Sequence, residues 1–172
     1  MCIRDRVNPN LKMLWVGDGP EKGSLKLSCP NSIFTGVQRG EVLASHYASG
    51  DIFLFSSLSE TFGNVTIEAM ASGLAVLAYD YAAARQFIDH GVNGFLASPN
   101  EANSFVTAGL ELIKDDVNLE NLRAHARQTT LEISWDQVPK KLENNYHDLI
   151  LNSHSKDKLA SSPVLREIFI KQ

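Results

Sequence analysis

The sequence predicts an α/β domain built on a doubly wound parallel sheet. Short apolar segments alternate with helical patterns along the chain, which is the order of parallel strands joined by crossover helices. Two of these segments, residues 51–55 and 74–79, are almost entirely apolar, as strands covered on both faces are. Ligands of such sheets bind beyond the carboxyl ends of the strands. The loops that follow the strands are therefore where the function is expected.

Each predicted strand is a short apolar run bounded by turn residues. Gly17 and Gly19 follow the first run, Gly36 follows the second, and a turn at residues 91–94 precedes the last. The strands are expected at residues 11–16, 32–35, 51–55, 74–79 and 95–97. Because a strand begins so close to the first residue, we expect the chain to start inside a larger fold. Whether residues 1–6 are native stays open.

The predicted helices lie between these strands and after the last one. Pro20 stands where a helix can start, Asn64 can cap the helix that follows it, and Gly73 can end that helix. Helices are expected at residues 20–28, 41–48, 65–72, 82–90, 101–114, 119–131 and 135–151. This order predicts a terminal segment at residues 1–10, one domain at 11–151 and a tail at 152–172.

Composition and charge exclude several classes of function. The 172 residues carry a formal net charge of −4, with 44% hydrophobic and 21% charged residues, which is a globular composition. Non-specific nucleic-acid binding needs clustered Lys and Arg, so nucleic acid is not an expected partner. No apolar run reaches the roughly 18 residues of a membrane span. Two cysteines and five histidines show no metal-ligand spacing, so no metal site and a cytoplasmic location are expected.

The loop and helix start at residues 56–68 carry the most chemical information. Gly63 and Asn64 place backbone N–H groups at a helix N-terminus, which suits a phosphate. Glu60 and Glu68 lie on either side and can accept hydrogen bonds from sugar hydroxyls. One loop thus offers a diphosphate cradle beside hydroxyl-binding groups, as a nucleotide-sugar requires. As alternatives, Glu60 is an ordinary loop acid and Glu68 an acid favoured near a helix start, although Val65 rules out a capping box with Glu68.

A second, weaker signal is Gly17-Asp18-Gly19 after the first predicted strand. Two close glycines allow the backbone to approach a ligand, but the third glycine of a dinucleotide fingerprint is missing. A strand-ending turn explains this pattern equally well.

Four blocks in order resemble a known family. Residues 59–76, Ser-Glu-Thr-Phe-Gly-Asn-Val-Thr-Ile-Glu-Ala-Met-Ala-Ser-Gly-Leu-Ala-Val, are similar to the E-x7-E region of retaining GT-B glycosyltransferases of family 4, also called group 1. Residues 15–20 and 34–37 resemble two further blocks of that domain, and residues 91–96 resemble the next one. Trp135 and the helix after it resemble the C-terminal end.

The resemblance implies a metal-independent enzyme with two Rossmann-like halves. This chain resembles the C-terminal half, which binds a UDP- or GDP-linked sugar, while the N-terminal half, absent here, binds a lipid or glycan acceptor. A hexose-type sugar is transferred with retention of configuration, and the leaving diphosphate assists the attacking hydroxyl. No cofactor beyond the donor substrate is implied. A full-length bacterial protein of this kind is cytoplasmic or peripheral at the inner face of the membrane.

The resemblance also assigns roles to residues. Glu60 is the catalytic candidate and binds the hydroxyls of the donor sugar, and Glu68 holds the ribose hydroxyls. Backbone donors near the helix start contact the sugar and the diphosphate, and two strand-ending loops approach the nucleotide. The sugar and diphosphate group is Glu60, Thr61, Phe62, Gly63, Asn64 and Val65. The remaining nucleotide-binding residues are Gly17, Asp18, Gly19, Val37 and Arg39.

Two departures from the family pattern matter. No block with the Arg and Lys that hold the diphosphate precedes residue 11, and Gln86 stands where the family usually has Glu. Because such cationic clamps supply much of the rate in low-dielectric sites, the chain alone is expected to be inactive. The stretch at residues 78–84 resembles bacterial members that glycosylate lipids, mannosyltransferases among them.

Two alternatives from other classes remain open. The first is a nucleotide-sugar 2-epimerase on the same double fold, which would need its own catalytic acids and a histidine near the sugar. The second is a non-catalytic α/β binding module, which would need no ordered pair of glutamates around Phe62 and Gly63.

Overall fold

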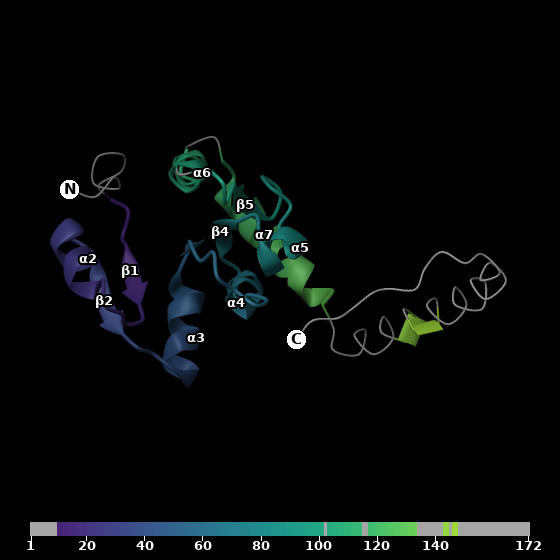
Figure 1. The fold of residues 1–172 in the computed structure, drawn as a ribbon, viewed down its shortest axis with the longest axis horizontal. Coiled ribbons are helices and arrows are strands. Elements are labelled where there is room, and N and C mark those ends of the chain that lie inside the picture. Colours follow the sequence, from purple (N-terminus) through teal and green to yellow (C-terminus); the bar gives the residue numbers. More distant parts are fainter. Residues whose placement is uncertain (1–9, 102, 115–116, 134–142, 145, 148–172) are drawn as a thin grey trace, which may run out of the picture. The chain divides into compact units, whose positions relative to one another are not determined.

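The computed structural model describes residues 10–101, 103–114, 117–133, 143–144 and 146–147. The chain divides into two compact units, Met1–Thr130 and Leu131–Gln172, and every strand described lies in the first (Figure 1). The expected terminal segment, the helix at 135–151 and the tail fall almost wholly outside the described residues. No helix among the described residues is both long and apolar enough to cross a membrane.

The α/β class with parallel strands is confirmed, but the strands do not form one sheet. Strands β1 (Leu14–Val16) and β2 (Ile33–Gly36) pair in parallel, and β3 (Ile52–Phe55), β4 (Ala75–Tyr79) and β5 (Gly94–Ala97) form a second parallel sheet with β4 in the centre. Within the described residues the two sheets are separate, because β1 and β3 each hydrogen-bond to a strand on one side only.

The helices follow the predicted order, and most of their bounds differ from the predicted ones by a few residues. The first four are α2 (Lys22–Ser28), α3 (Gly40–Ser49), α4 (Asn64–Ala71) and α5 (Ala82–Phe87), and α6 (Ser104–Leu112) and α7 (Leu119–Leu131) follow β5. Asn64 does not cap α4, because Gly63 occupies the cap position in a left-handed conformation with φ of 91°. Glycine adopts this conformation without the steric cost of a Cβ atom.

Strand β4 is the centre of the hydrophobic core. Its first four residues are at most 1% exposed, and successive side chains point to opposite faces of the sheet. Val76 and Ala78 pack with residues of α4, α5 and α7, whereas Ala75 and Leu77 pack with β5, α6 and α7. Helices thus cover both faces of this sheet, as the apolar sequence of β4 requires.

Two arginines of α7 hold the C-terminal end of α4 and the turn after it. Arg123 donates to the Gly73 carbonyl at 2.8 Å and to the Asp51 carboxylate at 2.6 Å. Arg127 donates to the Ala71 carbonyl. Carbonyls at the end of a helix have no partner within the helix, and positive charge is favourable there. These contacts therefore stabilise α4 at the end opposite the predicted site.

Tyr47 links α3 to α4. Its ring lies 5.6 Å from the ring of Phe53 and packs against the core cluster that contains Met70 and Val76. Burial raises the pKa of the Tyr47 hydroxyl, and the charge of the Glu68 carboxylate and a hydrogen bond to it raise that pKa further. The neutral hydroxyl is therefore the form that the folded state favours.

Gly94, the first residue of β5, allows β5 to lie close to β4. A Cβ atom at this position would lie 2.8 Å from the Val76 carbonyl oxygen and 3.0 Å from the Ile88 side chain. The first of these neighbours is backbone and cannot rotate away. Any side chain at position 94 would therefore push β5 away from the central strand.

We expect Gly94→Ala to lower the free energy of unfolding by about 1–3 kcal/mol, the usual cost of overpacking. The measurement is the midpoint of urea unfolding followed by circular dichroism. Gly23→Ala is the matched control, because a Cβ there meets nothing within 4 Å and alanine is favoured within a helix. An unchanged midpoint for Gly94→Ala would show that β5 tolerates the shift.

We expect Tyr47→Phe to reduce the loss of stability at high pH. The ordinary pKa of the group is 10.0 and the folded-state value is higher. The folded state therefore retains the Tyr47 proton more strongly than the unfolded state does. The resulting contribution to the free energy of unfolding is fully present below the ordinary pKa and is lost as the pH rises through the folded-state pKa. Urea midpoints measured from about pH 8 to about pH 11 should fall less in Tyr47→Phe than in Tyr146→Phe, which removes an exposed hydroxyl. Parallel curves would contradict the assignment.

Candidate functional site

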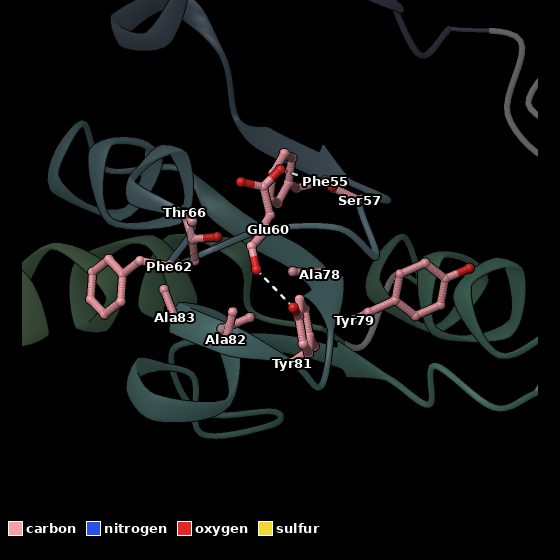
Figure 2. Close-up of a pocket in the computed structure, with 12 residues that line it drawn as sticks. Phe55, Ser57, Glu60, Phe62, Thr66, Ala78, Tyr79, Tyr81, Ala82 and Ala83 are labelled. Carbon is pink, nitrogen blue, oxygen red and sulfur yellow. Dashed lines mark hydrogen bonds between the residues drawn. The ribbon is translucent and has the colours of Figure 1, made fainter. Parts of the chain in front are cut away.

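A small hollow lies where the loops after β3 and β4 meet the start of α4. Figure 2 shows the side chains that line it: the Tyr81 hydroxyl points to the backbone carbonyl of Glu60, and the Glu60 carboxylate points the other way, toward Ser57 and Phe55. The side chains that define it are Phe55, Ser57, Glu60, Phe62, Thr66 and Tyr81. Because β3 and β4 are parallel, both loops leave the sheet at its carboxyl edge, where ligands of such sheets bind.

Glu60 is held at both its side chain and its backbone. The Ser57 hydroxyl donates to carboxylate oxygen Oε1 at 2.8 Å, and the Tyr81 hydroxyl donates to the Glu60 carbonyl oxygen at 2.7 Å. The side chain is half-buried. Within the described residues, the other carboxylate oxygen, Oε2, accepts no hydrogen bond. An anionic acceptor with one unpartnered oxygen beside the hollow is suited to a hydroxyl group.

Gly63 determines how α4 begins beside the hollow. Its left-handed backbone turns the chain directly into the helix, and its carbonyl accepts from the Thr66 N–H at 3.0 Å. A Cβ at position 63 would lie 3.7 Å from the Ala83 methyl group and 3.8 Å from Glu60 Cγ. Gly63 is buried, while the side chains of Thr61 and Asn64 are exposed and that of Val65 is half-buried. The free N–H groups at this helix start carry the positive end of the helix dipole.

The start of α5 forms the opposite wall of the hollow. The Ala83 N–H donates to the Phe62 carbonyl at 2.7 Å, and the Phe62 ring meets the Phe87 ring edge to face at 6.2 Å. Ala82 has a φ of 49°, a left-handed conformation that is unusual for a residue other than glycine. Small side chains at Ala82, Ala83 and Ala84 leave room for the hollow.

Half of the predicted sugar and diphosphate residues line the hollow, and none of the predicted nucleotide residues does. Glu60, Phe62 and Gly63 line it, whereas Thr61, Asn64 and Val65 do not. Glu68 is exposed about one turn into α4, with Tyr47 as a neighbour. Gly17, Asp18 and Gly19 follow β1, and Val37 and Arg39 follow β2, all five of them exposed. These residues lie at the carboxyl edge of the other sheet, outside the hollow.

Asp18 makes its own network in the loop after β1. Its carboxylate accepts from the Gly19 N–H at 2.9 Å and from Lys22 Nζ at 3.0 Å. The hydrogen bond from Lys22 lowers the pKa of Asp18, with the Gly19 N–H and the charge of Lys22 acting in the same direction. Asp18 is therefore ionised and already partnered, and the half-buried Lys22 ammonium adds a cation beside this loop.

An ion pair that the sequence reading missed lies next to the hollow. Arg85 donates from Nε to the Asp80 carboxylate at 2.9 Å, and this bond and the charge of Asp80 raise the pKa of Arg85. Both side chains are largely exposed. The signal in the sequence was an Asp at the end of a strand and an Arg five residues later in the next helix. The periodicity of a strand or of a helix does not predict that two residues so placed will meet.

No group of three or more His, Cys, Asp and Glu side chains within the described residues is arranged to hold a metal ion. His90 is exposed, whereas His46 is half-buried. His90 also has a structural contact, since its Nδ1 accepts from the Leu96 N–H at 3.0 Å.

Comparison with known proteins identifies the family. Residues 2–115, more than half of the chain, match the model of the glycosyl transferases group 1. The chain is 34% identical over 144 residues to the sulfoquinovosyl transferase SQD2 of Arabidopsis thaliana, covering 81% of this chain and 28% of that protein. It is 33% identical over 141 residues to a GDP-mannose-dependent alpha-mannosyltransferase of Corynebacterium glutamicum, covering 82% and 34%. The chain thus spans about a third of the length of these relatives.

Solved structures agree on the fold. The C-terminal domain of a glycosyl transferase group 1 family protein, LpcC, from Francisella tularensis superposes with a TM-score of 0.66 at 23% identity, covering 76% of this chain and 73% of that one. Anabaena HepE, solved in complex with UDP and glucose, superposes with a TM-score of 0.59 at 26% identity, covering 81% of this chain and 42% of that one.

The order of the strands, the loop that carries Glu60 and the family match agree with one another. The chain belongs to the group 1 glycosyltransferases and corresponds to the C-terminal domain of their GT-B fold.

Proposed function

We propose that this chain binds a nucleoside-diphosphate sugar and forms the donor half of a retaining glycosyltransferase that moves a hexose to a lipid or glycan acceptor. The observation that carries the proposal is the Glu60 carboxylate. It is fixed by Ser57, faces the hollow and lies beside the start of α4. An anionic acceptor for hydroxyls and a donor-rich helix end for phosphates are therefore adjacent.

The sugar is proposed to lie over the open side of the hollow, whose own volume of about 10 Å³ holds no more than a water molecule. Glu60 Oε1 already accepts from Ser57, so Oε2 is the oxygen offered to a sugar hydroxyl. Charge-assisted hydrogen bonds of this kind are about twice as strong as neutral ones. The aromatic side chains of Phe55 and Phe62 supply apolar walls, which exclude water and strengthen the interaction.

The diphosphate is proposed to lie at the start of α4. The left-handed Gly63 removes a side chain from the approach to the helix, and the N–H groups of Asn64 and Val65 are the first donors of its first turn. The side chain of Thr61, in the same loop, is exposed to a ligand. No Lys or Arg lines the hollow, so the backbone alone supplies positive potential within it.

The nucleoside is proposed to extend from there toward Glu68 and the loops after β1 and β2. Glu68 would accept from the ribose hydroxyls, and the Tyr47 hydroxyl lies near enough to its carboxylate for the two to interact. Gly17, Asp18 and Gly19 would contact the nucleotide through their backbone, while Val37 and Arg39 would flank the base. Exposure of Val37 and Arg39 leaves both side chains available for this contact.

The chemical step needs more than this chain. In the proposed reaction the bond between the anomeric carbon and the diphosphate breaks, the acceptor hydroxyl adds to the same face, and its proton passes to the leaving diphosphate. Glu60 positions and stabilises the sugar during this exchange. The chain spans about a third of its relatives, so the acceptor site is proposed to lie in the rest of the protein. The 172-residue chain alone is then expected to show no transfer.

The two alternatives are less well supported. Family membership favours a transferase over a 2-epimerase, and no histidine lines the hollow. A binding module without catalysis would not require the Glu60 side chain to be held by Ser57. Transfer by a protein that contains this domain, compared with hydrolysis or epimerisation of the same donor, distinguishes the three.

The direct test is calorimetric titration of the 172-residue chain with UDP, UDP-glucose, GDP and GDP-mannose. The proposal expects one nucleotide pair to bind and the sugar-linked form to bind more tightly than the free diphosphate. Binding of none of the four, or equal binding of all four, would contradict it.

We expect Glu60→Gln to weaken binding of the nucleotide-sugar and to leave binding of the free nucleoside diphosphate nearly unchanged. The cost should be about 1.5–3 kcal/mol, the value of a hydrogen bond to a charged group. Calorimetric titration with both ligands measures the difference. Glu111→Gln, which changes an exposed glutamate of α6, is the control. Equal affinities of Glu60→Gln and the parent for the nucleotide-sugar would remove Glu60 from the site.

We expect Glu68→Ala to weaken binding of the free nucleoside diphosphate itself by about 1.5–3 kcal/mol, because a charge-assisted bond to ribose is lost. Glu41→Ala, an exposed glutamate of α3, is the control. Tyr47→Phe separates this role from a structural one, since it removes the protein partner of Glu68 and keeps the carboxylate. Undiminished nucleotide affinity in Glu68→Ala would show that the ribose role is wrong.

A further inference from the structure

Tyr81 is the residue through which the loop after β4 contacts Glu60. Its hydroxyl donates to the Glu60 carbonyl oxygen at 2.7 Å, the contact drawn as a dashed line in Figure 2. We propose that Tyr81 is a positioning residue, which holds the Glu60 backbone so that the carboxylate faces the hollow. This inference rests on the proposed function, because it concerns how the proposed sugar-binding carboxylate is placed.

A second hydrogen bond joins the same two segments. The Ala83 N–H donates to the Phe62 carbonyl at 2.7 Å, two residues along each segment from the Tyr81–Glu60 contact. Together the two bonds clamp residues 60–62 against residues 81–83. One bond alone would leave a hinge, whereas two bonds fix both the position and the direction of the Glu60 backbone.

The conformation of Ala82 supports this interpretation. Ala82 lies between the two bonded residues and has a φ of 49°, which is unfavourable for a residue with a Cβ atom. Such strain persists where the surroundings over-determine the conformation, and it concentrates at functional sites. Here the left-handed turn directs the Tyr81 side chain and the Ala83 N–H toward the same loop.

The two ends of Glu60 are held by different elements. Ser57, which precedes Glu60 in its own loop, fixes Oε1 at 2.8 Å, and Tyr81 fixes the backbone from the far side of the hollow. The Ser57 bond fixes the Glu60 carboxylate relative to the loop after β3, but it does not fix the position of that loop relative to the rest of the site. The Tyr81 bond fixes that position, because it comes from a different loop.

The test compares Tyr81→Phe with Tyr146→Phe in the 172-residue chain. Both changes remove one phenolic hydroxyl, but Tyr146 is exposed and is not among the residues that line the hollow. Two measurements are made: calorimetric titration with the free and sugar-linked forms of UDP and GDP, and hydrogen exchange of the amides of residues 57–63 and of Ala83.

We expect Tyr81→Phe to weaken binding of the nucleotide-sugar about 3- to 10-fold, as loss of one neutral hydrogen bond implies, and to change binding of the free nucleoside diphosphate less than about twofold. Exchange of the Ala83 amide and of the loop should be faster. Tyr146→Phe should match the parent in both measurements.

Three results would overturn the inference. Unchanged preference for the sugar-linked form in Tyr81→Phe would show that Tyr81 does not place Glu60. An equal loss of affinity for both ligand forms would show a general structural role, and unchanged exchange at Ala83 would show that the clamp does not depend on the hydroxyl.

If the parent itself binds no nucleotide or shows no preference for the sugar-linked form, the proposed function fails as well. That result would be seen in the parent protein without any variant, so it can be told apart from a failure of the Tyr81 inference alone.

Discussion

Burial of β4 on both faces is the constraint on which the rest of this structure depends. Its side chains alternate between two clusters that recruit α4, α5, α6 and α7, and its backbone pairs with β3 on one side and β5 on the other. Because the sheet is parallel, this one strand also determines where the loops after β3 and β4 emerge. The hollow at Glu60 and Tyr81 exists where those two loops meet.

The candidate site is electrostatically incomplete on its own. Glu60 is an anion and the only ionisable residue among those that line the hollow apart from tyrosines, and the nearby Arg85 is neutralised by Asp80. A donor with two phosphates therefore meets a helix end but no uncompensated cation in the hollow itself. This arrangement suits a domain that places the sugar precisely enough for chemistry while charge neutralisation of the leaving group comes from elsewhere in the whole protein.

Much of this could be predicted from the sequence, because short apolar runs and glycines report local structure. The α/β class, the five strands and the loop with Glu60 all follow from residues close together in the chain. The division into two sheets could not be predicted, because strand partners are chosen in three dimensions and not by the apolar pattern. The same holds for the contacts of Tyr81 with Glu60 and Ala83 with Phe62, which join residues 21 positions apart. Asn64 was predicted as the cap of α4 from its residue type, but the left-handed Gly63 beside it takes that position.

The contrast in burial between the two sheets has a consequence for local unfolding. Residues of β4 are inaccessible, whereas β1 and β2 contain no buried residue and α2 and α3 bury none either. Segments with few buried apolar contacts open at lower free energy than the core does. The elements between Glu60 and Tyr81, α4 and β4, therefore belong to the more stable part of the domain, and those that carry Gly17 to Gly19 and Val37 belong to the least stable part. In the proposed binding mode, the nucleoside end of a donor would contact the less stable part, and the entropic cost of ordering the protein would fall there.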